Sequence, residues 1–311
     1  MILEEPLVSI CSTTFNREKY IGQAIESWLS QKVNFSFEIV ISDDCSTDNT
    51  IQIIEEYIEL NPNVKIKLLK SAKNQGFVKN SIKVYESAKG KYIAHCDGDD
   101  YWIDDYKLQK QFDFLENNAD YVMCFTNSYI INDYTNEKRK AKVNIWDTCT
   151  TRDILEEHNS LKAAKYGEIQ TLAHMSSILF RNYLIKSFPK WYYTTYMNDD
   201  TLFVMLSKFG KAKLINEICA VYRFNEEGVS KKNFSFEKDL KGRIKFYKDL
   251  NKYLNFEFHN SIAKLLFEYN YKLSKLYFRN NNIIYLTITL FETFYIKLYI
   301  QFYRFKSMFK Y

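Results

Sequence analysis

The stretch Tyr92-Ile-Ala-His-Cys-Asp-Gly-Asp-Asp100 joins a strand-like run to three carboxylates within four residues. Lys91–Cys96 has the composition of a short buried strand, so we expect the acidic groups just beyond its carboxyl end. Carboxylates this close repel one another unless a cation neutralises them, and hard oxygen ligands suit Mg²⁺ or Mn²⁺. The pattern favours a divalent metal site. An acidic turn capping a helix at Trp102 or Asp104 is the alternative.

Upstream of this stretch, strand-like and helix-like patterns alternate. The runs Leu7–Thr13, Phe37–Ser42 and Val64–Leu69 are short, apolar and rich in β-branched residues. Strands joined by helices cross over with one hand, which predicts a mostly parallel sheet with helices on both faces. The apolar positions at helical spacing are Ile21, Ala24, Ile25, Trp28 and Leu29, then Ile51, Ile54 and Ile58, then Val78, Ile82 and Tyr85.

Several of these predicted strands end in polar residues. The first ends at Thr13 and the second runs into Asp43-Asp44. Ligands bind beyond the carboxyl ends of the strands in such sheets, so we expect these residues and Asp97–Asp100 to share one crevice. Response-regulator phosphoacceptor domains also place acidic residues at strand ends, but the length of 311 residues and the distant elements argue against that class.

Composition places the chain among globular proteins. Its 311 residues are enough for one large or two modest domains, and 46% apolar and 26% charged residues exclude a disordered or fibrous chain. The net charge is +5, but residues 231–311 carry +10, which leaves −5 for residues 1–230. The candidate chemistry lies in the acidic part, so we expect no nucleic-acid partner.

Cysteine spacing and hydropathy bear on location. The six cysteines form no Cys-x-x-Cys motif, so we expect neither a disulfide framework nor a zinc site. The first residues lack a basic region followed by an apolar core, which favours a cytoplasmic protein. The longest apolar candidate, Ile283–Ile296, has 14 residues and is interrupted by Glu292, too short for a membrane span.

Beyond residue 115 the order of elements becomes irregular. We predict strands at Tyr121–Phe125, Ser176–Phe180 and Leu214–Tyr222, and a helix at Thr201–Phe209 that Gly210 ends. From about Glu237 only helical patterns remain. We therefore expect a body at 1–230, with two halves of about 1–115 and about 116–230. A helical extension at 231–311 follows, with the boundary between 228 and 236.

Taken together, these motifs resemble those of family 2 glycosyltransferases of the GT-A fold, in the bacterial polysaccharide and lipopolysaccharide branch. The resemblance is dense over residues 6–115, thinner over 170–230 and absent beyond about 232. Five motifs in order make it specific, although each alone is weak. The matching segments are Val8–Asn16, Ile41–Asp48, Asn74–Gly76, Tyr92–Asp100 with Lys107, Leu108 and Gln111, and later His174–Ser177, Asn198-Asp199 and Val221–Arg223.

The resemblance implies that 1–230 is the catalytic domain, with a donor half of about 1–115 and an acceptor half of about 116–230. It also implies roles for five donor-binding residues. Thr13 and Phe15 would line the nucleotide pocket, with Phe15 near the base. Asp44 would accept the uracil imide N–H. Asp97 would approach the ribose and phosphates, and Asp99 would ligate a Mn²⁺ or Mg²⁺ ion that bridges the diphosphate.

The resemblance also implies a catalytic base. Asp199 occupies the position of the family's catalytic Asp, although Asn198 replaces the preceding Glu and leaves Asp200 as the alternative. A hydroxyl that attacks the anomeric carbon needs one base, and the departing diphosphate needs charge neutralisation. Such a direct displacement inverts the centre without a covalent intermediate. A family histidine expected after Arg223 is Asn225 here, which puts that residue's role in metal or phosphate binding in doubt.

The implied activity is transfer of a sugar from a nucleotide-diphosphate donor, a UDP-sugar, to a glycan or lipid-linked acceptor in cell-surface polysaccharide synthesis. One alternative is a sugar nucleotidyltransferase, which would carry a glycine-rich loop near the N-terminus, and Ser12–Asn16 has no glycine. The other is an inactive nucleotide-sugar binding protein, which would lack the base.

The roles of two histidines and of the C-terminal tail have more than one interpretation. We interpret His95 as a packing residue of its strand, and His174 as either packed or facing the acceptor. The stripe Ile262, Leu265, Leu266, Tyr269 and Leu273 favours packing on the body. Residues 283–311 mix aromatic and basic side chains, which is also compatible with peripheral binding to an anionic membrane surface on its inner face, or with a dimer contact.

Overall fold

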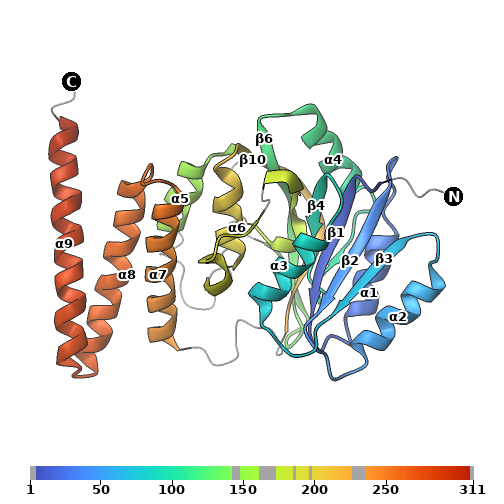
Figure 1. The fold of residues 1–311 in the computed structure, drawn as a ribbon, viewed down its shortest axis with the longest axis horizontal. Coiled ribbons are helices and arrows are strands. Elements are labelled where there is room, and N and C mark those ends of the chain that lie inside the picture. Colours follow the sequence, from blue (N-terminus) through green and yellow to red (C-terminus); the bar gives the residue numbers. More distant parts are fainter. Residues whose placement is uncertain are drawn as a thin grey trace.

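The computed structural model describes residues 5–141, 148–160, 173–184, 187–195, 198–225 and 235–308. These parts form one ten-stranded sheet with helices on its faces, followed by three C-terminal helices (Figure 1). The strand order along the main path is β3-β2-β1-β4-β9-β6-β10-β5.

The first half of the sheet is parallel, as predicted. It contains β1 (Val8–Thr14), β2 (Phe37–Asp43), β3 (Lys65–Lys70) and β4 (Tyr92–His95). Helices α1 (Ile21–Leu29) and α2 (Thr50–Leu60) lie on one face and α3 (Phe77–Ser87) on the other, because their apolar side chains join two separate clusters of buried residues. This arrangement brings the carboxyl ends of β1, β2 and β4 together.

The second half of the sheet mixes directions. β6 (Tyr121–Asn132) and β10 (Lys211–Phe224) are parallel, whereas β9 (Leu179–Arg181) runs antiparallel to β4 and β6. The predicted α/β fold with helices around a central sheet is confirmed, with antiparallel pairs added in the acceptor half. The remaining strands, all antiparallel to their neighbours, are β5 (Tyr101–Trp102), β7 (Glu137–Lys140) and β8 (Thr148–Cys149).

The strand predicted at Ser176–Phe180 is wrong in its first part. Residues Met175–Ser177 form a 3-10 turn, η2, and the strand β9 begins only at Leu179. The Ser177 N–H and hydroxyl both donate to the His174 carbonyl, at 2.9 and 2.7 Å, and so close a local turn in place of a strand ladder.

Helices and short 3-10 turns cover the second half of the sheet. The helix predicted at Thr201–Phe209 is present as α6 and begins three residues earlier, at Asn198. The other elements of this half are α4 (Lys107–Asn117), α5 (Thr151–Ser160), η3 (Asn182–Leu184) and η4 (Tyr192–Thr194).

The tail is helical, as predicted, and consists of α7 (Phe236–Tyr253), α8 (His259–Arg279) and α9 (Ile283–Met308). The Ser235 hydroxyl caps α7 by accepting from the Lys238 N–H. The ring of Trp191 contacts Phe246 and Tyr253 of α7, with ring centres 6.4 and 5.9 Å apart. Helices α7 and α8 therefore continue the core of the body. The domain boundary proposed at 228–236 falls mostly outside the described residues.

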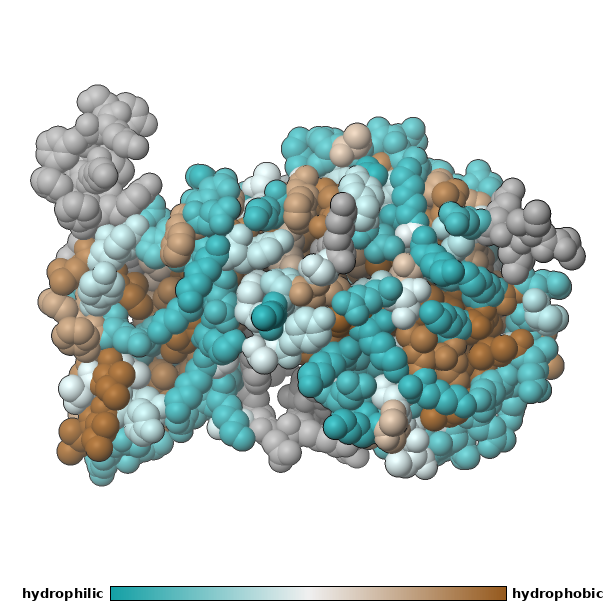
Figure 2. Space-filling model, in the orientation of Figure 1, coloured by the Kyte–Doolittle hydropathy of each residue, from teal (hydrophilic) through white to brown (hydrophobic). Residues whose placement is uncertain are grey.

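The predicted stripe on α8 is buried, which confirms that this part of the tail packs on its neighbours. Helix α9 differs, because among its described side chains Thr289 and Thr293 are buried and Leu286 and Ile296 partly buried, while Ile284 (73% exposed), Phe291 (74%) and Tyr295 (68%) face outward. Apolar side chains accordingly line the outer margin of the molecule where α9 lies (Figure 2). Within the described residues, no helix is both long and apolar enough to cross a lipid bilayer.

Candidate functional site

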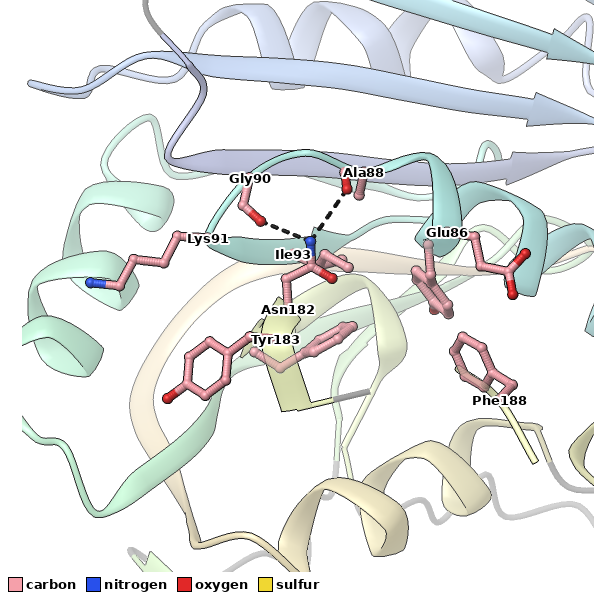
Figure 3. A pocket seen from close by; sticks show the side chains of 10 residues that line it. Glu86, Ala88, Gly90, Lys91, Ile93, Asn182, Tyr183 and Phe188 are labelled. Carbon is pink, nitrogen blue, oxygen red and sulfur yellow. Dashed lines mark hydrogen bonds between the residues drawn. The ribbon is translucent and has the colours of Figure 1, made fainter. Parts of the chain in front are cut away.

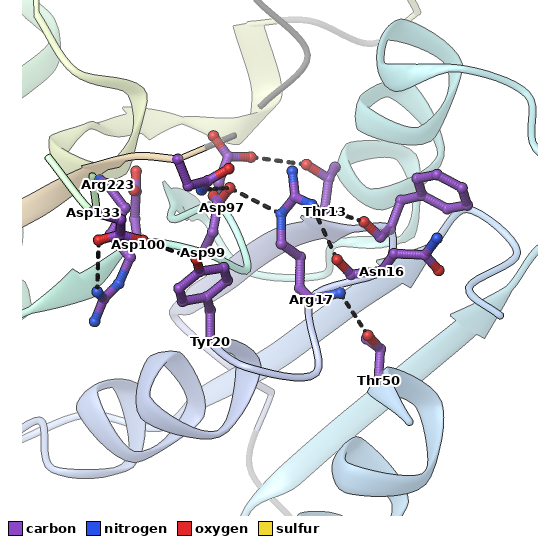
Figure 4. A network of polar contacts seen from close by, with 12 residues as sticks. Thr13, Asn16, Arg17, Tyr20, Thr50, Asp97, Asp99, Asp100, Asp133 and Arg223 are labelled. Atoms are coloured by element: carbon purple, nitrogen blue, oxygen red, sulfur yellow. Dashed lines mark hydrogen bonds and ion pairs between the residues drawn. The ribbon is translucent and has the colours of Figure 1, made fainter. Parts of the chain in front are cut away.

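The predicted polar residues gather where β1, β2 and β4 end. In the parallel register Thr13 lies beside Ser42, so the loop after β2 reaches the end of β1. The Asp44 N–H donates to the Thr14 carbonyl at 2.9 Å. The Thr13 hydroxyl donates to Asp97 Oδ1 at 2.8 Å, which joins β1 to the loop after β4 (Figure 4). The polar residues expected at the strand ends therefore lie together.

Asp97 is held by partners that favour its charge. Its Oδ1 accepts from Thr13 and lies 3.0 Å from His95 Nε2. Burial raises the pKa of this carboxyl, but His95, Thr13 and the Arg17 charge together outweigh burial and lower the pKa below its usual value. Asp97 is therefore ionised at neutral pH.

Asp99 lies next to the positively charged side chain of Arg17. Its Oδ2 accepts from Arg17 Nε at 2.9 Å and from Asn225 Nδ2 at 3.0 Å. Arg17 also donates through Nη1 to the carbonyls of Phe15 and Asn16, so it connects the loop after β1 to the acidic loop (Figure 4). Burial raises the pKa of Asp99, and Arg17 offsets part of that rise.

The donor set around Asp99 fits a hard cation. Asn225 is only 4% exposed, and its Oδ1 is buried without a hydrogen-bond partner among the described residues. A carboxylate beside an unsatisfied amide oxygen offers the oxygen ligands that Mg²⁺ and Mn²⁺ take, and these ions keep further positions for phosphate and water. Asn225 thus stands at Asp99, where the resemblance placed a histidine.

The carboxylate of Asp100 makes hydrogen bonds that connect parts of the fold. Its carboxylate accepts from the Ser176 hydroxyl and, at 2.8 Å, from the Arg223 N–H. Burial raises its pKa well above the usual value, with Asp99 and Asp97 adding to the rise. Asp100 therefore ties the acidic loop to η2 and β10.

Asp44 shapes the neighbouring loop. Its two oxygens accept from the backbone N–H groups of Gln75 and Gly76, each at 2.8 Å, and the side chain is buried. Gly76 adopts a φ of 89°, which glycine tolerates and other residues rarely do. Phe15 lies at the same edge and is partly exposed. The predicted nucleotide-pocket residues are thus neighbours of Asp97 and Asp99.

Asp199 lies in the first turn of α6 and acts on the same cluster. Burial raises the pKa of the Tyr222 phenol, and the charges of Asp100, Asp99, Asp199 and Asp97 raise it further. Four carboxylates, three from the loop after β4 and one from α6, are therefore within electrostatic reach of one hydroxyl.

Asp200, the alternative base, faces another part of the molecule. Its charge acts on the phenol of Tyr247 in α7, whose pKa is raised chiefly by burial. The two consecutive aspartates therefore influence different surroundings, one the crevice and the other the tail.

Sequence reasoning missed two residues of this site. It assigned Arg17 no role, although a single cation directly after the Asn16 motif was a usable signal. His95 is buried, as a packing residue would be, but both its ring nitrogens have polar partners, which that interpretation omitted. The usable signal was its position as the last residue of the strand, two residues before Asp97.

His174 is buried against the crevice. Its ring stacks on Tyr222 with centres 4.7 Å apart, and its Nε2 is buried without a hydrogen-bond partner among the described residues. Burial, with a smaller contribution from the charge of Arg139, lowers the pKa of His174 to about 4, so the ring is neutral at pH 7.

Two other features lie away from this edge. A cavity of 520 Å³ near the amino end of β4 is lined by Gly90, Lys91 and Phe188 among others, and Asn182 donates to the Gly90 carbonyl at its wall (Figure 3). The second feature gathers ligand atoms of Asp104, Glu217 and Cys219, but the Lys110 ammonium already pairs with both carboxylates, at 2.7 and 2.5 Å.

Comparisons with known proteins agree with this geometry. Residues 9–188 match the model of the family described as glycosyl transferase family 2. TuaG of Bacillus subtilis, a glycosyltransferase named for teichuronic acid biosynthesis, is 35% identical over 111 residues, or 36% of this chain and 42% of TuaG. Chondroitin synthase of Pasteurella multocida is 28% identical over 240 residues, or 75% of this chain and 22% of the synthase. The chain thus spans less than half the length of these relatives.

Solved structures share the fold. S. aureus TarS 1–349 in complex with UDP-GlcNAc superposes with a TM-score of 0.62 at 19% identity, covering 91% of this chain and 90% of the other. The mannosyltransferase PcManGT of Pyrobaculum calidifontis, in complex with GDP-Man and Mn²⁺, gives 0.55 at 12% identity, covering 96% and 84%. At these identities the likeness concerns architecture alone.

Proposed function

The chain belongs to glycosyl transferase family 2 and has the GT-A fold, and from this premise we propose that it is an inverting, metal-dependent glycosyltransferase. Its donor would be a nucleotide-diphosphate sugar, a UDP-sugar, and its acceptor a glycan or a lipid-linked glycan in cell-surface polysaccharide synthesis. The observation that carries the proposal is that Asp97, Asp99 and Asp199 lie around Tyr222, the pKa of whose phenol is raised chiefly by burial and further by their charges.

The donor half supplies binding and orientation. Thr13 and Phe15 belong to the loop after β1, and Asp44 stands beside them with an orientation fixed by backbone N–H groups. We assign these three residues to the nucleotide pocket and Asp97 to the ribose and phosphates. Asp99, with Asn225 beside it, would hold Mn²⁺ or Mg²⁺, which when bound neutralises the negative charge of the leaving diphosphate.

Asp199 is the proposed general base. It would accept the proton of the acceptor hydroxyl while that oxygen attacks the anomeric carbon from the side opposite the diphosphate. One displacement of this kind inverts the configuration. Asp200 is the less suitable candidate, because its charge acts on Tyr247 of the tail.

Support for the donor and acceptor classes comes from relatives. TarS was solved with UDP-GlcNAc and PcManGT with GDP-Man and Mn²⁺, so both carry nucleotide sugars at this fold. TuaG and chondroitin synthase are named for surface polysaccharides. We propose in addition that the outward apolar face of α9 rests on an anionic membrane surface at the cytoplasmic side, where a lipid-linked acceptor would be met.

Thermal unfolding with a panel of UDP-, GDP- and dTDP-sugars, with and without Mn²⁺, tests the donor and the metal. A ligand that binds only the native state raises the unfolding temperature by mass action. We expect a shift with a UDP-sugar that depends on Mn²⁺ and is lost in Asp99→Asn. Asp105→Asn is the matched control, because Asp105 is 44% exposed and pairs only with Lys32 in the described contacts. Full nucleotide binding and turnover by Asp99→Asn would contradict the metal assignment.

Turnover of two further variants tests the base. We expect Asp199→Asn to abolish sugar transfer while donor affinity stays within about threefold, because a base acts on the acceptor and not on the nucleotide. Asp200→Asn should retain transfer. Loss in Asp200→Asn alone would move the base by one residue, and activity in both variants would exclude this mechanism.

A further inference from the structure

We propose that His95, backed by Tyr85, is a positioning residue that presents a single oxygen of Asp97, Oδ2, to the donor. This inference rests on the proposed function, since it assigns a device for orienting the carboxylate that binds the nucleotide sugar. It concerns a side chain that does not itself reach the crevice.

The three side chains form a buried chain of contacts behind the crevice. His95 has no exposed surface, its Nδ1 lies 2.9 Å from the Tyr85 hydroxyl, and its Nε2 lies 3.0 Å from Asp97 Oδ1. Tyr85 is fixed in turn, because its ring lies edge-on to Phe180 at 5.8 Å and stacks on Phe188 at 6.0 Å. The imidazole is thus held at both nitrogens between a packed phenol and a carboxylate.

The direction of one hydrogen bond follows from the atoms that it joins. Asp97 Oδ1 is a carboxylate oxygen that already accepts from the Thr13 hydroxyl, and an oxygen of this kind accepts hydrogen bonds. His95 Nε2, at 3.0 Å, therefore carries a proton and donates to Oδ1. The Tyr85 hydroxyl, 2.9 Å from Nδ1, holds the other side of the ring.

The two oxygens of the Asp97 carboxylate therefore have different hydrogen-bond partners. Oδ1 receives two donors, the His95 N–H and the Thr13 hydroxyl, whereas the described contacts give Oδ2 no partner. The Asp97 side chain is 24% exposed, so a part of it does reach the crevice. With Oδ1 saturated and the ring immobile, Oδ2 is the oxygen available to a ligand, and its direction is set before the ligand arrives. A preformed orientation of this kind saves the ordering cost of binding.

Two amide substitutions separate positioning from packing. The side-chain nitrogen of Gln can occupy the place of the imidazole Nε2, whereas that of Asn reaches only the place of Nδ1. We expect His95→Gln to keep the donor KM and the UDP affinity within about threefold. His95→Asn should raise the donor KM and weaken UDP about tenfold or more, which is the worth of one hydrogen bond to a charged group, with kcat changed less. Tyr85→Phe should fall between the two.

Thermal unfolding and UDP titration of the same variants decide the outcome. The inference holds if Gln restores the affinity that Asn loses while both variants unfold at similar temperatures. It is overturned if Asn binds UDP as the wild type does, or if Gln and Asn lose affinity equally. Wild-type protein that binds no nucleotide diphosphate, with or without Mn²⁺, would instead overturn the proposed function, so the two failures are distinguishable.

Discussion

Burial opposes the ionisation of Asp97, Asp99 and Asp100, and each of the three carboxylates has different partners. Asp97 is surrounded by donors and keeps a lowered pKa, whereas Asp100 lies against two other carboxylates and has a raised one. A shift of one pKa unit corresponds to about 1.4 kcal/mol between the two protonation states. Neighbouring residues of one loop therefore differ in charge and in role.

His174 gives a pH-dependent prediction. Its folded-state pKa of about 4 is below the value of 6.5 in an unfolded chain. Between those values the unfolded chain binds a proton that the folded protein does not, so stability falls as pH drops from 6.5 to 4. We expect wild-type protein to lose up to about 3 kcal/mol relative to His174→Phe across this window.

The comparison needs the variant because other groups titrate in the same range. Chemical unfolding at pH 7, 6, 5 and 4 measures the difference directly, and Phe keeps an aromatic ring against Tyr222. Parallel pH profiles of the two proteins would show that His174 is protonated equally in the folded and unfolded states.

At the scale of elements, the tail helices carry part of the core. Leu250 of α7 is fully buried in the cluster that also contains side chains of α6 and β6. We expect Leu250→Ala to lower the free energy of unfolding by about 2–5 kcal/mol, because it leaves a cavity in that cluster.

Leu60→Ala is the matched control for this change. Leu60 ends α2 and is 77% exposed, so the same substitution should cost less than about 0.5 kcal/mol. Urea unfolding measures both variants. Equal effects would show that α7 is a separate appendage that does not stabilise the body.

Much of the donor half could be predicted from the sequence because its signals are local. Strand periods, helical spacing and acidic strand ends predicted β1 to β4, α1 to α3 and the meeting of Thr13, Asp44 and Asp97. The acceptor half was harder, since β9 has only three residues and runs antiparallel between distant partners. Turn closure by Ser177 and the long strand β10, with its register shifts against β6, depend on pairing that no local pattern encodes.

The residues of the site also divide into those that a local sequence pattern predicts and those that depend on contacts between elements. Residues in ordered motifs were predicted, whereas the contact of Arg17 with Asp99 and that of His95 with Tyr85 each join two different elements. Arg17 reaches Asp99 across 82 positions, and His95 reaches Tyr85 through the packing of α3 on the sheet. Such contacts become visible only when the elements are assembled.

Charge and exposed apolar side chains are unevenly distributed over the whole molecule. Residues 231–311 carry +10, and the outward face of α9 is apolar and aromatic, whereas its inward face carries Thr289 and Thr293. An anionic bilayer would match both properties, with about 1 kcal/mol for each basic residue near the lipid surface.

We expect wild-type protein to sediment with vesicles containing anionic lipid at low salt, and less so as salt rises. The triple variant Ile284→Gln, Phe291→Gln and Tyr295→Gln should remain folded and lose this binding. Leu60→Gln, which changes an exposed leucine on the far α2, should retain it. Wild-type protein that ignores such vesicles would contradict the membrane proposal. A dimer that the triple variant dissolves would assign the face to a second copy of the chain.

The contacts of Asp44 have a consequence for divergence among related chains. Both of its oxygens are held by main-chain N–H groups of the loop before α3, and main-chain donors survive nearly any side-chain substitution. Residues 71–75 can therefore drift, or be randomised in a library, without releasing the carboxylate, provided that Gly76 keeps its φ of 89°. Under the proposed function, substitutions in this loop could change the donor preference while the backbone that holds Asp44 keeps its conformation.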